Sequence, residues 1–358
     1  MMSKLQDICF YVTEKMSVTE LTDKNTYIST ENMLPDKGGI TIPATIPADG
    51  KITAYKRNDV LVSNIRPYFK KIWFALSDGG CSNDVLVFRV KEGISPDYLH
   101  YILADNAFFD YAMKTSKGTK MPRGDKKAIM EYEVAIMDFE DQQKTSSILR
   151  LIDQKIAINN TINENLEQQA QALFKAHFEN NNLQTVRFGD IATFKYGKMP
   201  KKDKITVEGY PLFSGYQIVG YYPEKMFDEP QIIVVARGVG GCGDIKYTPS
   251  NCYLTNLAIA ITPNDLSYED YLFRLLKNTD MKILNTGSAQ PQITVDSLQK
   301  FEIPVPSREE AELYSNMITP IKERYRLNIA ENLRLASLRD TLLPKLMNGE
   351  IDVSAARI

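Results

Sequence analysis

Short apolar runs separated by turns occupy residues 1–138 and return over residues 184–306. The stretch 84–90 is typical, since it is rich in Val and begins beside turn residues. β-Branched and aromatic runs of this length, bounded by Gly, Pro, Asn and Asp, predict strands. One amphipathic helix interrupts each set of strands, near 96–112 and 267–278. The pattern therefore predicts two strand-rich units, each with its own short helix.

Two long helices are predicted after the strand-rich parts. Residues 139–178 contain neither Gly nor Pro and predict one continuous helix. A second helix is predicted from about 308 to 347, where Gly349 favours a C-terminal cap. Pro320 and Pro344 lie inside this helix, so we expect a kink or a break near each of them.

A seam with alternating spacings of four and three residues runs along both predicted helices. This spacing is typical of a coiled coil, because it turns one stripe of residues toward a partner helix. Two asparagines interrupt the apolar seam at equivalent points in both helices, and a buried seam asparagine fixes register while weakening the packing. The alternative is that these asparagines lie on a solvated flank. We expect the two helices to pair antiparallel, through Ile152, Ile156, Asn159, Asn163, Leu166, Ala170 and Leu173 in the first and Ile321, Tyr325, Asn328, Asn332, Leu335, Arg339 and Leu342 in the second.

The second half of the chain repeats the first at a slowly decreasing offset. Asp7 recurs as Asp190 after 183 positions, and Asn83 recurs as Asn256 after 173. From Gly118 onward the offset is 169. A period of this length predicts two similar domains with approximate two-fold symmetry, and not a solenoid of short repeats. The boundaries that we expect are 1–138 and 181–306 for the globular domains, 139–180 for the central spacer helix, and 307–358 for the C-terminal spacer helix and tail.

Composition limits the class of protein. The chain of 358 residues is 43% apolar and 25% charged, which is typical of a globular protein of about two domains. No apolar run approaches the roughly 20 residues of a membrane span, and the first ten residues do not resemble a signal peptide. The four cysteines form no CxxC pair, which indicates free thiols and disfavours a metal site. We therefore expect a cytoplasmic protein without a membrane partner.

Positive charge is clustered even though the net charge is −2. This net charge argues against a protein that coats nucleic acid nonspecifically, but it allows specific binding by a local basic surface. Six basic residues lie within 114–127, where Asp125 is the only acid, and five lysines lie within 195–204. Either cluster alone fits a solvated loop. One cluster in each half favours an electrostatic surface for duplex DNA, whose own symmetry suits a two-domain reader.

Several segments resemble one known family. Residues 335–351 read LASLRDTLLPKLMNGEI and resemble the closing signature of the specificity subunits of type I restriction-modification systems. Residues 169–175, QAQALFK, resemble the central spacer of that family. The ends of the globular parts are also similar to it, at 301–306 and more loosely at 132–137. The resemblance covers essentially the whole chain.

The resemblance implies an α+β fold with two pseudo-symmetric target-recognition domains, separated by two long helices that form an antiparallel coiled coil. It implies that each domain reads one half of a bipartite, asymmetric sequence in double-stranded DNA. The helices would dock two adenine methyltransferase subunits, which bind S-adenosylmethionine and methylate the DNA. This chain would hold no cofactor of its own. Two motor-nuclease subunits would join in the form that cuts DNA.

The sequence itself disfavours catalysis by this chain. It has no Pro-Pro pair, so it lacks the Asn/Asp-Pro-Pro-aromatic loop of an adenine methyltransferase, and it has no Gly-Lys-Ser/Thr motif. The sequence has only two histidines, His100 and His177, both on predicted helices, which leaves little for acid–base or metal chemistry. The glycine-rich stretch 237–243 has no glycine-rich counterpart in the first half, which favours a hairpin turn over a phosphate cradle. A self-contained methyltransferase or nuclease and a coiled-coil scaffold that reads no DNA are the alternatives.

Base and phosphate contacts require Arg, Lys, Asn, Gln or hydroxyl side chains on exposed loops. Asn83 and Asn256 have an alternative role, because each precedes a strand and fits a residue that caps a turn. The candidate loops 65–70 and 238–243 differ in sequence, which predicts two different half-sites. The DNA-binding candidates are Asn64, Arg66, Tyr68, Lys70, Lys71, Asn83, Lys117, Lys120 and Arg123 in the first half, and Lys198, Ser214, Tyr216, Gln217, Arg237, Lys246, Asn256, Ser288, Gln290 and Gln292 in the second.

Overall fold

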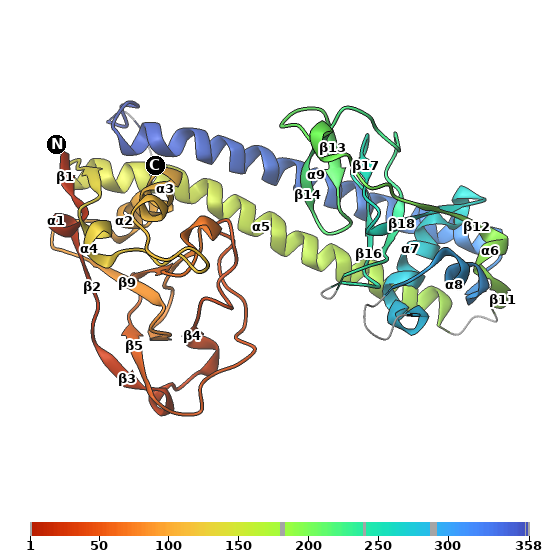
Figure 1. The fold of residues 1–358 in the computed structure, drawn as a ribbon, viewed down its shortest axis with the longest axis horizontal. Helices are drawn as coiled ribbons and strands as arrows, with labels where there is room; N and C mark the ends of the chain where they lie inside the picture. Colours follow the sequence, from red (N-terminus) through yellow and green to blue (C-terminus); the bar gives the residue numbers. More distant parts are fainter. Residues whose placement is uncertain (1, 180–182, 239–240, 287–291, 355, 357–358) are drawn as a thin grey trace. The chain divides into compact units, whose positions relative to one another are not determined.

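A computed structural model describes residues 2–179, 183–238, 241–286, 292–354 and 356 (Figure 1). The chain divides into two compact units. Unit 1 comprises Met1–Asn160 and Ile329–Ile358, and unit 2 comprises Thr161–Asn328. The helices α5 (Phe139–Phe178) and α9 (Arg308–Met347) each contribute residues to both units. Each unit therefore combines one strand-rich part with a stretch of both long helices.

Unit 1 contains two four-stranded sheets. The first is antiparallel throughout and has the order β2 (Cys9–Tyr11), β9 (Val85–Val90), β6 (Val60–Ser63), β7 (Ile72–Phe74). The second has the order β3 (Lys15–Ser17), β5 (Lys51–Tyr55), β8 (Gly79–Cys81), β4 (Tyr27–Ile28), with β4 and β8 parallel. A short antiparallel pair, β1 (Met2–Lys4) with β10 (Glu133–Ala135), closes the unit.

The helix expected near 96–112 is two helices in unit 1, α2 (Pro96–Ala104) and α3 (Asn106–Lys114). Asp105 separates them because its backbone is extended and its carboxylate accepts a hydrogen bond from the amide of Ala107 at 2.9 Å. An aspartate in this position caps the following helix, so the chain bends where one helix was predicted. The remaining helices of unit 1 are short, α1 (Leu5–Ile8), α4 (Lys126–Met130) and the 3₁₀ turns η1 (Val18–Glu20), η2 (Lys24–Thr26) and η3 (Pro67–Phe69).

Unit 2 repeats this plan. Its antiparallel sheet has the order β12 (Ala192–Tyr196), β18 (Ala258–Pro263), β15 (Ile232–Val235), β16 (Ile245–Tyr247). A three-stranded sheet has the order β14 (Ile218–Tyr222), β13 (Tyr210–Phe213), β17 (Tyr253–Leu254), and β11 (Gln184–Arg187) pairs with β19 (Glu302–Val305). Its helices are α6 (Phe188–Ile191), α7 (Glu269–Asn278), α8 (Val295–Lys300) and the 3₁₀ turns η4 (Lys202–Lys204), η5 (Leu266–Tyr268) and η6 (Met281–Leu284).

Ends of the long helices complete both cores. In unit 1, Leu343 and Leu346 of α9 are buried with Leu99 of α2 and Phe88 of β9. In unit 2, Phe174 and Phe178 of α5 and Tyr314 of α9 are buried together with Tyr271 of α7. Burial of a large side chain contributes about 1.5–3 kcal/mol, so each strand-rich part is fastened to the helices by its own core.

Contacts within each unit show that α5 and α9 run antiparallel. In unit 1, Asp153 accepts a hydrogen bond from Arg339 at 2.9 Å and Asn159 donates one to Asn332 at 2.9 Å. In unit 2, Asn328 donates to Asn163 at 2.8 Å. Positions that rise along α5 thus meet positions that fall along α9, as the seam predicts. Asn159, Asn163 and Asn328 are buried, whereas the predicted seam residue Tyr325 is 41% exposed.

The helix α9 continues through both of its prolines. A break at Pro320 or Pro344, one of the two expected outcomes, is therefore wrong. Proline removes its own backbone donor and its ring crowds the carbonyl four residues earlier. Ile318, near Pro320, and Leu343 and Leu346, near Pro344, are buried in the cores and hold the helix together. Within the described ranges, no helix is both long and apolar enough to cross a membrane.

Candidate nucleic-acid interface

The candidate residues of unit 1 lie at one end of the β2-β9-β6-β7 sheet. Ser63, the last residue of β6, pairs with Val85, the first residue of β9. The loops 64–71 and 82–84 therefore leave the sheet at the same end. The amide of Asn64 donates to the carbonyl of Asp84 at 2.8 Å and joins these two loops. We call this region the unit 1 sheet end.

A third segment, 116–125, is added to the unit 1 sheet end by backbone hydrogen bonds. The amide of Arg66 donates to the carbonyl of Pro122 at 2.8 Å, and the amide of Gly124 donates to the carbonyl of Asn64 at 3.2 Å. Lys117 and Arg123 exchange two backbone hydrogen bonds, of 2.9 and 3.0 Å. The fold thus brings together candidates that are more than 50 positions apart in sequence.

Two cations of the 116–125 segment, Lys117 and Arg123, are paired with acids but remain accessible. Arg123 lies 3.2 Å from Asp84, and Lys117 lies 2.6 Å from Asp125. The hydrogen bond from Lys117 holds the pKa of Asp125 below its usual value. The Lys117 side chain is nevertheless 82% exposed, and Lys120 is exposed as well. Exposed ion pairs are worth at most about 1 kcal/mol, so a DNA phosphate can take over these cations at little cost.

Asn64 and Arg66 lie deeper than the sequence suggests. Asn64 is 9% exposed, and its Oδ1 has no hydrogen-bond partner among the described residues. A Cβ on Gly124 would lie 2.8 Å from this oxygen, so glycine leaves room for the amide. Arg66 has a left-handed backbone with φ 50°, and its Nε is buried without a partner in the described part of the chain. Tyr68 is more accessible, at 47% exposed.

Lys70 and Lys71 are engaged within the protein. The Lys70 ammonium donates to Asn106 Oδ1 at 2.9 Å, at the start of α3. The Lys71 ammonium donates to the carbonyl of Thr30 at 2.6 Å and lies 5.7 Å from the centre of the Phe69 ring. Burial lowers the pKa of Lys71. The structure therefore places these two lysines as anchors of the 64–71 loop.

Asn83 is exposed and is held by a lysine that the sequence did not indicate. The ammonium of Lys15 donates to Asn83 Oδ1 at 2.6 Å and to Thr53 Oγ1 at 2.9 Å. This side-chain contact differs from the side-chain-to-backbone bond expected of a turn cap. Lys15 lies 68 positions before Asn83, so no local pattern could have linked the two.

Unit 2 gathers its candidates at the matching end of the β12-β18-β15-β16 sheet. The amides of Ala236 and Arg237 both donate to the carbonyl of Leu257, at 2.8 and 3.2 Å, and the amide of Ile293 donates to Ala236 at 3.0 Å. Asn64 makes the same backbone contacts in unit 1. Ala236, and not Arg237, is therefore the structural equivalent of Asn64. The offset of 173, which matches loop 65–70 with loop 238–243 and Asn64 with Arg237, is wrong by one residue here. The equivalence is set by hydrogen bonds of the backbone, which do not depend on side-chain identity, so it cannot be read from two loops with different sequences.

Tyr216 is central to the unit 2 sheet end. Its hydroxyl donates to the carbonyl of Arg237 at 2.9 Å, and the ammonium of Lys246 lies 5.6 Å from its ring centre. Burial raises the pKa of Tyr216. Ser214 is buried, and its hydroxyl accepts from the amides of Tyr216 and Gln217. Ser214 therefore shapes the turn that leaves Gln217 exposed.

The other unit 2 candidates lie on neighbouring segments. Lys198 is exposed. Its amide donates a hydrogen bond of 2.9 Å to the carbonyl of Leu254, which stands two residues before the candidate Asn256. Gln292 forms an isolated antiparallel bridge with Arg237. The candidates Ser288 and Gln290 lie outside the described residues. The fold thus brings Lys198, Tyr216, Arg237, Asn256 and Gln292 to one sheet end.

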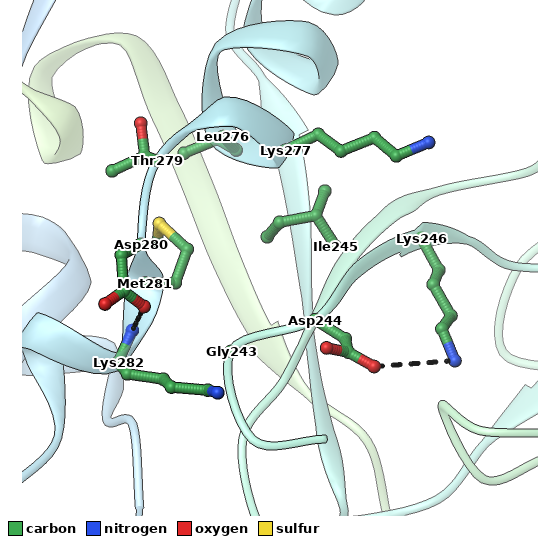
Figure 2. Close-up of a pocket in the computed structure, with 10 residues that line it drawn as sticks. All are labelled: Gly243, Asp244, Ile245, Lys246, Leu276, Lys277, Thr279, Asp280, Met281 and Lys282. Carbon is green, nitrogen blue, oxygen red and sulfur yellow. Dashed lines mark hydrogen bonds and ion pairs between the residues drawn. The ribbon is translucent and has the colours of Figure 1, made fainter. Parts of the chain in front are cut away.

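The strands on either side of the glycine-rich stretch 237–243, β15 and β16, pair antiparallel, as expected for a hairpin. A depression of about 380 Å³ lies between residues 243–246, at the end of this stretch and the start of β16, and residues 276–282. Figure 2 shows Lys282 alongside Gly243, and Asp244 reaching toward Lys246 at 3.9 Å. Lys282 is exposed and was not among the candidates. Its closeness to Gly243 arises from η6, which is separated from the turn by almost forty positions.

Comparison with known proteins gives consistent matches. The family model described as "Type I restriction modification DNA specificity domain" matches residues 1–168 and 180–332. The HindI specificity subunit, a type I restriction enzyme subunit of Haemophilus influenzae, is 24% identical over 86% of this chain and 89% of its own length. The MjaIX specificity subunit of Methanocaldococcus jannaschii is 23% identical, over 74% of this chain and 71% of its own.

A solved structure has the same fold. The type I restriction-modification S subunit from M. genitalium superimposes with a TM-score of 0.58 at 15% identity, covering 97% of this chain and 96% of that one. The predicted α+β architecture, with two recognition domains and two long antiparallel helices, is thereby confirmed. The named relatives are specificity subunits and give the scaffold alternative no support. The chain belongs to the type I restriction-modification DNA specificity family, and it is a specificity subunit of such a system.

Proposed function

We propose that this chain is the non-catalytic DNA-reading subunit of its complex and that each unit reads one half of a bipartite target through its sheet end. One observation carries the proposal. In each unit, basic, amide and hydroxyl side chains from distant segments converge on the same end of an equivalent sheet, around Arg66 and Arg123 in unit 1 and around Tyr216 and Arg237 in unit 2. Such side chains recognise base edges and phosphates.

The two sheet ends support an asymmetric target. In unit 1 the loop between β6 and β7 contains the turn η3 with Arg66 and Tyr68. In unit 2 the equivalent connection is the glycine-rich turn, and Arg237 is its basic residue. Different side chains on the same scaffold present different donors and acceptors to the groove. Two different half-sites follow from this difference.

The long helices offer surfaces for two methyltransferase subunits. Outside the seam, unit 1 exposes Leu151 by 57%, Ile158 by 55% and Leu333 by 70%, while unit 2 exposes Leu313 by 52% and Leu327 by 63%. Single exposed apolar residues are common, but their repetition along both helices favours protein docking. The methyltransferase subunits would bind S-adenosylmethionine and methylate adenine, two motor-nuclease subunits would complete the cutting form, and the complex would act in the cytoplasm.

The test is adenine-methylation mapping of genomic DNA from cells that carry this chain with its cognate methyltransferase subunit. The matched control is the same strain without this chain. A bipartite methylated motif that disappears with the chain is the expected result. Methylation that is independent of the chain would contradict the proposal.

A further inference from the structure

A tight turn in unit 1 touches the loop that contains Arg66. The amide of Leu34 donates to the carbonyl of Gly39 at 2.8 Å, which closes residues 34–39 into a compact turn. Its central residues, Asp36 and Lys37, have left-handed backbones with φ 52° and 62°. Left-handed backbone is unfavourable for residues with a side chain, because Cβ comes too close to the following carbonyl oxygen. We call this segment the 34–39 turn.

The 34–39 turn is hydrogen-bonded to the 66–70 loop. The amide of Asp36 donates to the carbonyl of Phe69 at 2.8 Å, and the amide of Lys37 donates to the carbonyl of Lys70 at 3.0 Å. The opposite side of the loop is held by the bond from Arg66 to Pro122. The loop is thus held from two directions by segments that are distant in sequence.

Strained backbone is concentrated in this contact. In the described part of the chain, six non-glycine residues have positive φ, and four of them are Asp36, Lys37, Arg66 and Lys70. Strained residues persist only where the surroundings hold them, and they cluster at sites where geometry matters for function. The concentration of left-handed residues at this contact therefore points to a functional role for the 66–70 loop.

The side chain of Lys37 fastens the turn to α9. It is 10% exposed, and its ammonium lies 3.8 Å from Asp340. Arg339 donates to the same carboxylate and also to Asp153 of α5, at 2.9 Å in each case. Burial lowers the pKa of Lys37, while Asp340 opposes this effect. A desolvated ammonium needs its counterion, so the turn is tied to the helix pair of unit 1.

We propose that the 34–39 turn, through Lys37 and its contact with Asp340, is the positioning element that sets the 66–70 loop for reading the first half-site. This inference rests on the proposed function. Lys37 acts through the backbone of Phe69 and Lys70, and not by touching a base. Arg66 and Tyr68 are the side chains whose placement it controls.

The test uses the full chain with its methyltransferase subunit and measures methylation of a DNA library in which each half-site is varied separately. The variant Lys37→Met keeps the aliphatic stem and removes the charge. We expect discrimination at the first half-site to fall about tenfold, with discrimination at the second half-site unchanged. Asp340→Asn should have the same effect, Lys37→Arg should preserve wild-type discrimination, and Lys24→Met, at an exposed lysine of the same unit, is the control.

The outcomes separate positioning from stability. A uniform decrease in methylation of all sites, with discrimination at the first half-site unchanged in both Lys37→Met and Asp340→Asn, would mean that the contact only stabilises unit 1, and would overturn the inference. Equal relaxation at both half-sites would overturn it as well. A wild-type chain that directs no methylated motif would instead overturn the proposed function.

Discussion

Asn328 of α9 donates a hydrogen bond of 2.8 Å to Asn163 of α5, and both side chains are buried. The bond leaves Asn163 Nδ2 and Asn328 Oδ1 without partners among the described residues. The pair therefore satisfies only part of its hydrogen-bonding capacity in a position that an apolar pair could fill. A buried amide pair of this kind favours one register of the two helices, because a shifted register would bury both amides unpaired.

Replacing one member of this pair should be worse than replacing both. Asn163→Leu leaves the Asn328 amide buried and unpaired, so we expect the free energy of unfolding to fall by about 1–3 kcal/mol. Asn163→Leu with Asn328→Leu should restore or exceed wild-type stability. Thermal unfolding of the three proteins measures this, with Asn165→Leu as an exposed control. Equal destabilisation by the single and the double substitution would argue against a direct pair.

Arg237→Ala should weaken reading of the second half-site alone. Each good base contact is worth about 1–3 kcal/mol of discrimination, or roughly 5- to 150-fold. Binding assays with DNA varied in one half-site at a time measure the loss. Arg187→Ala changes an exposed arginine of the same unit and should leave discrimination intact. A uniform loss of affinity for all sequences would mean that Arg237 contacts phosphate and not a base.

Docking of the methyltransferase subunit should depend on the exposed apolar side chains of the helices. Leu333→Glu with Leu338→Glu should abolish copurification of that subunit while unfolding remains that of the wild type, since both leucines are exposed. Leu266→Glu, at a position 72% exposed in η5 of unit 2, is the matched control. Unchanged copurification would place the docking surface elsewhere.

The stability of unit 1 should depend on pH through His100. Burial lowers the pKa of this imidazole to about 4, and the charge of Asp153 only partly opposes the effect. In the unfolded chain the pKa of histidine is about 6.5, so between these values the unfolded state binds the additional proton. Stability should therefore fall as the pH decreases from 6.5 toward 4. His100→Leu should reduce this dependence of thermal stability on pH. An NMR titration whose resonance is assigned to His100 and whose midpoint lies near 6.5 would contradict the mechanism.

Repetition and periodicity made the architecture predictable. The seam spacing indicated two paired helices, and Asn159 with Asn332 and Asn163 with Asn328 meet as antiparallel pairing requires. Local chemistry was harder to anticipate where two signals competed, as at Asp105, whose capping carboxylate divides one expected helix into two. The two prolines do not end α9, because burial of the neighbouring residues Ile318, Leu343 and Leu346 outweighs the tendency of proline to interrupt a helix.

The spacing of apolar residues and the internal repeat were sufficient to predict two strand-rich units on paired helices, because both signals depend on neighbouring or regularly spaced residues. Which loop side chains remain free for DNA depended on folding. Lys70 binds Asn106, Lys71 binds Thr30, and Asn64 is buried against Gly124. Each of these partners is separated from its candidate by more than 30 positions, and contacts over such distances are set by the packing of the whole unit and not by local sequence.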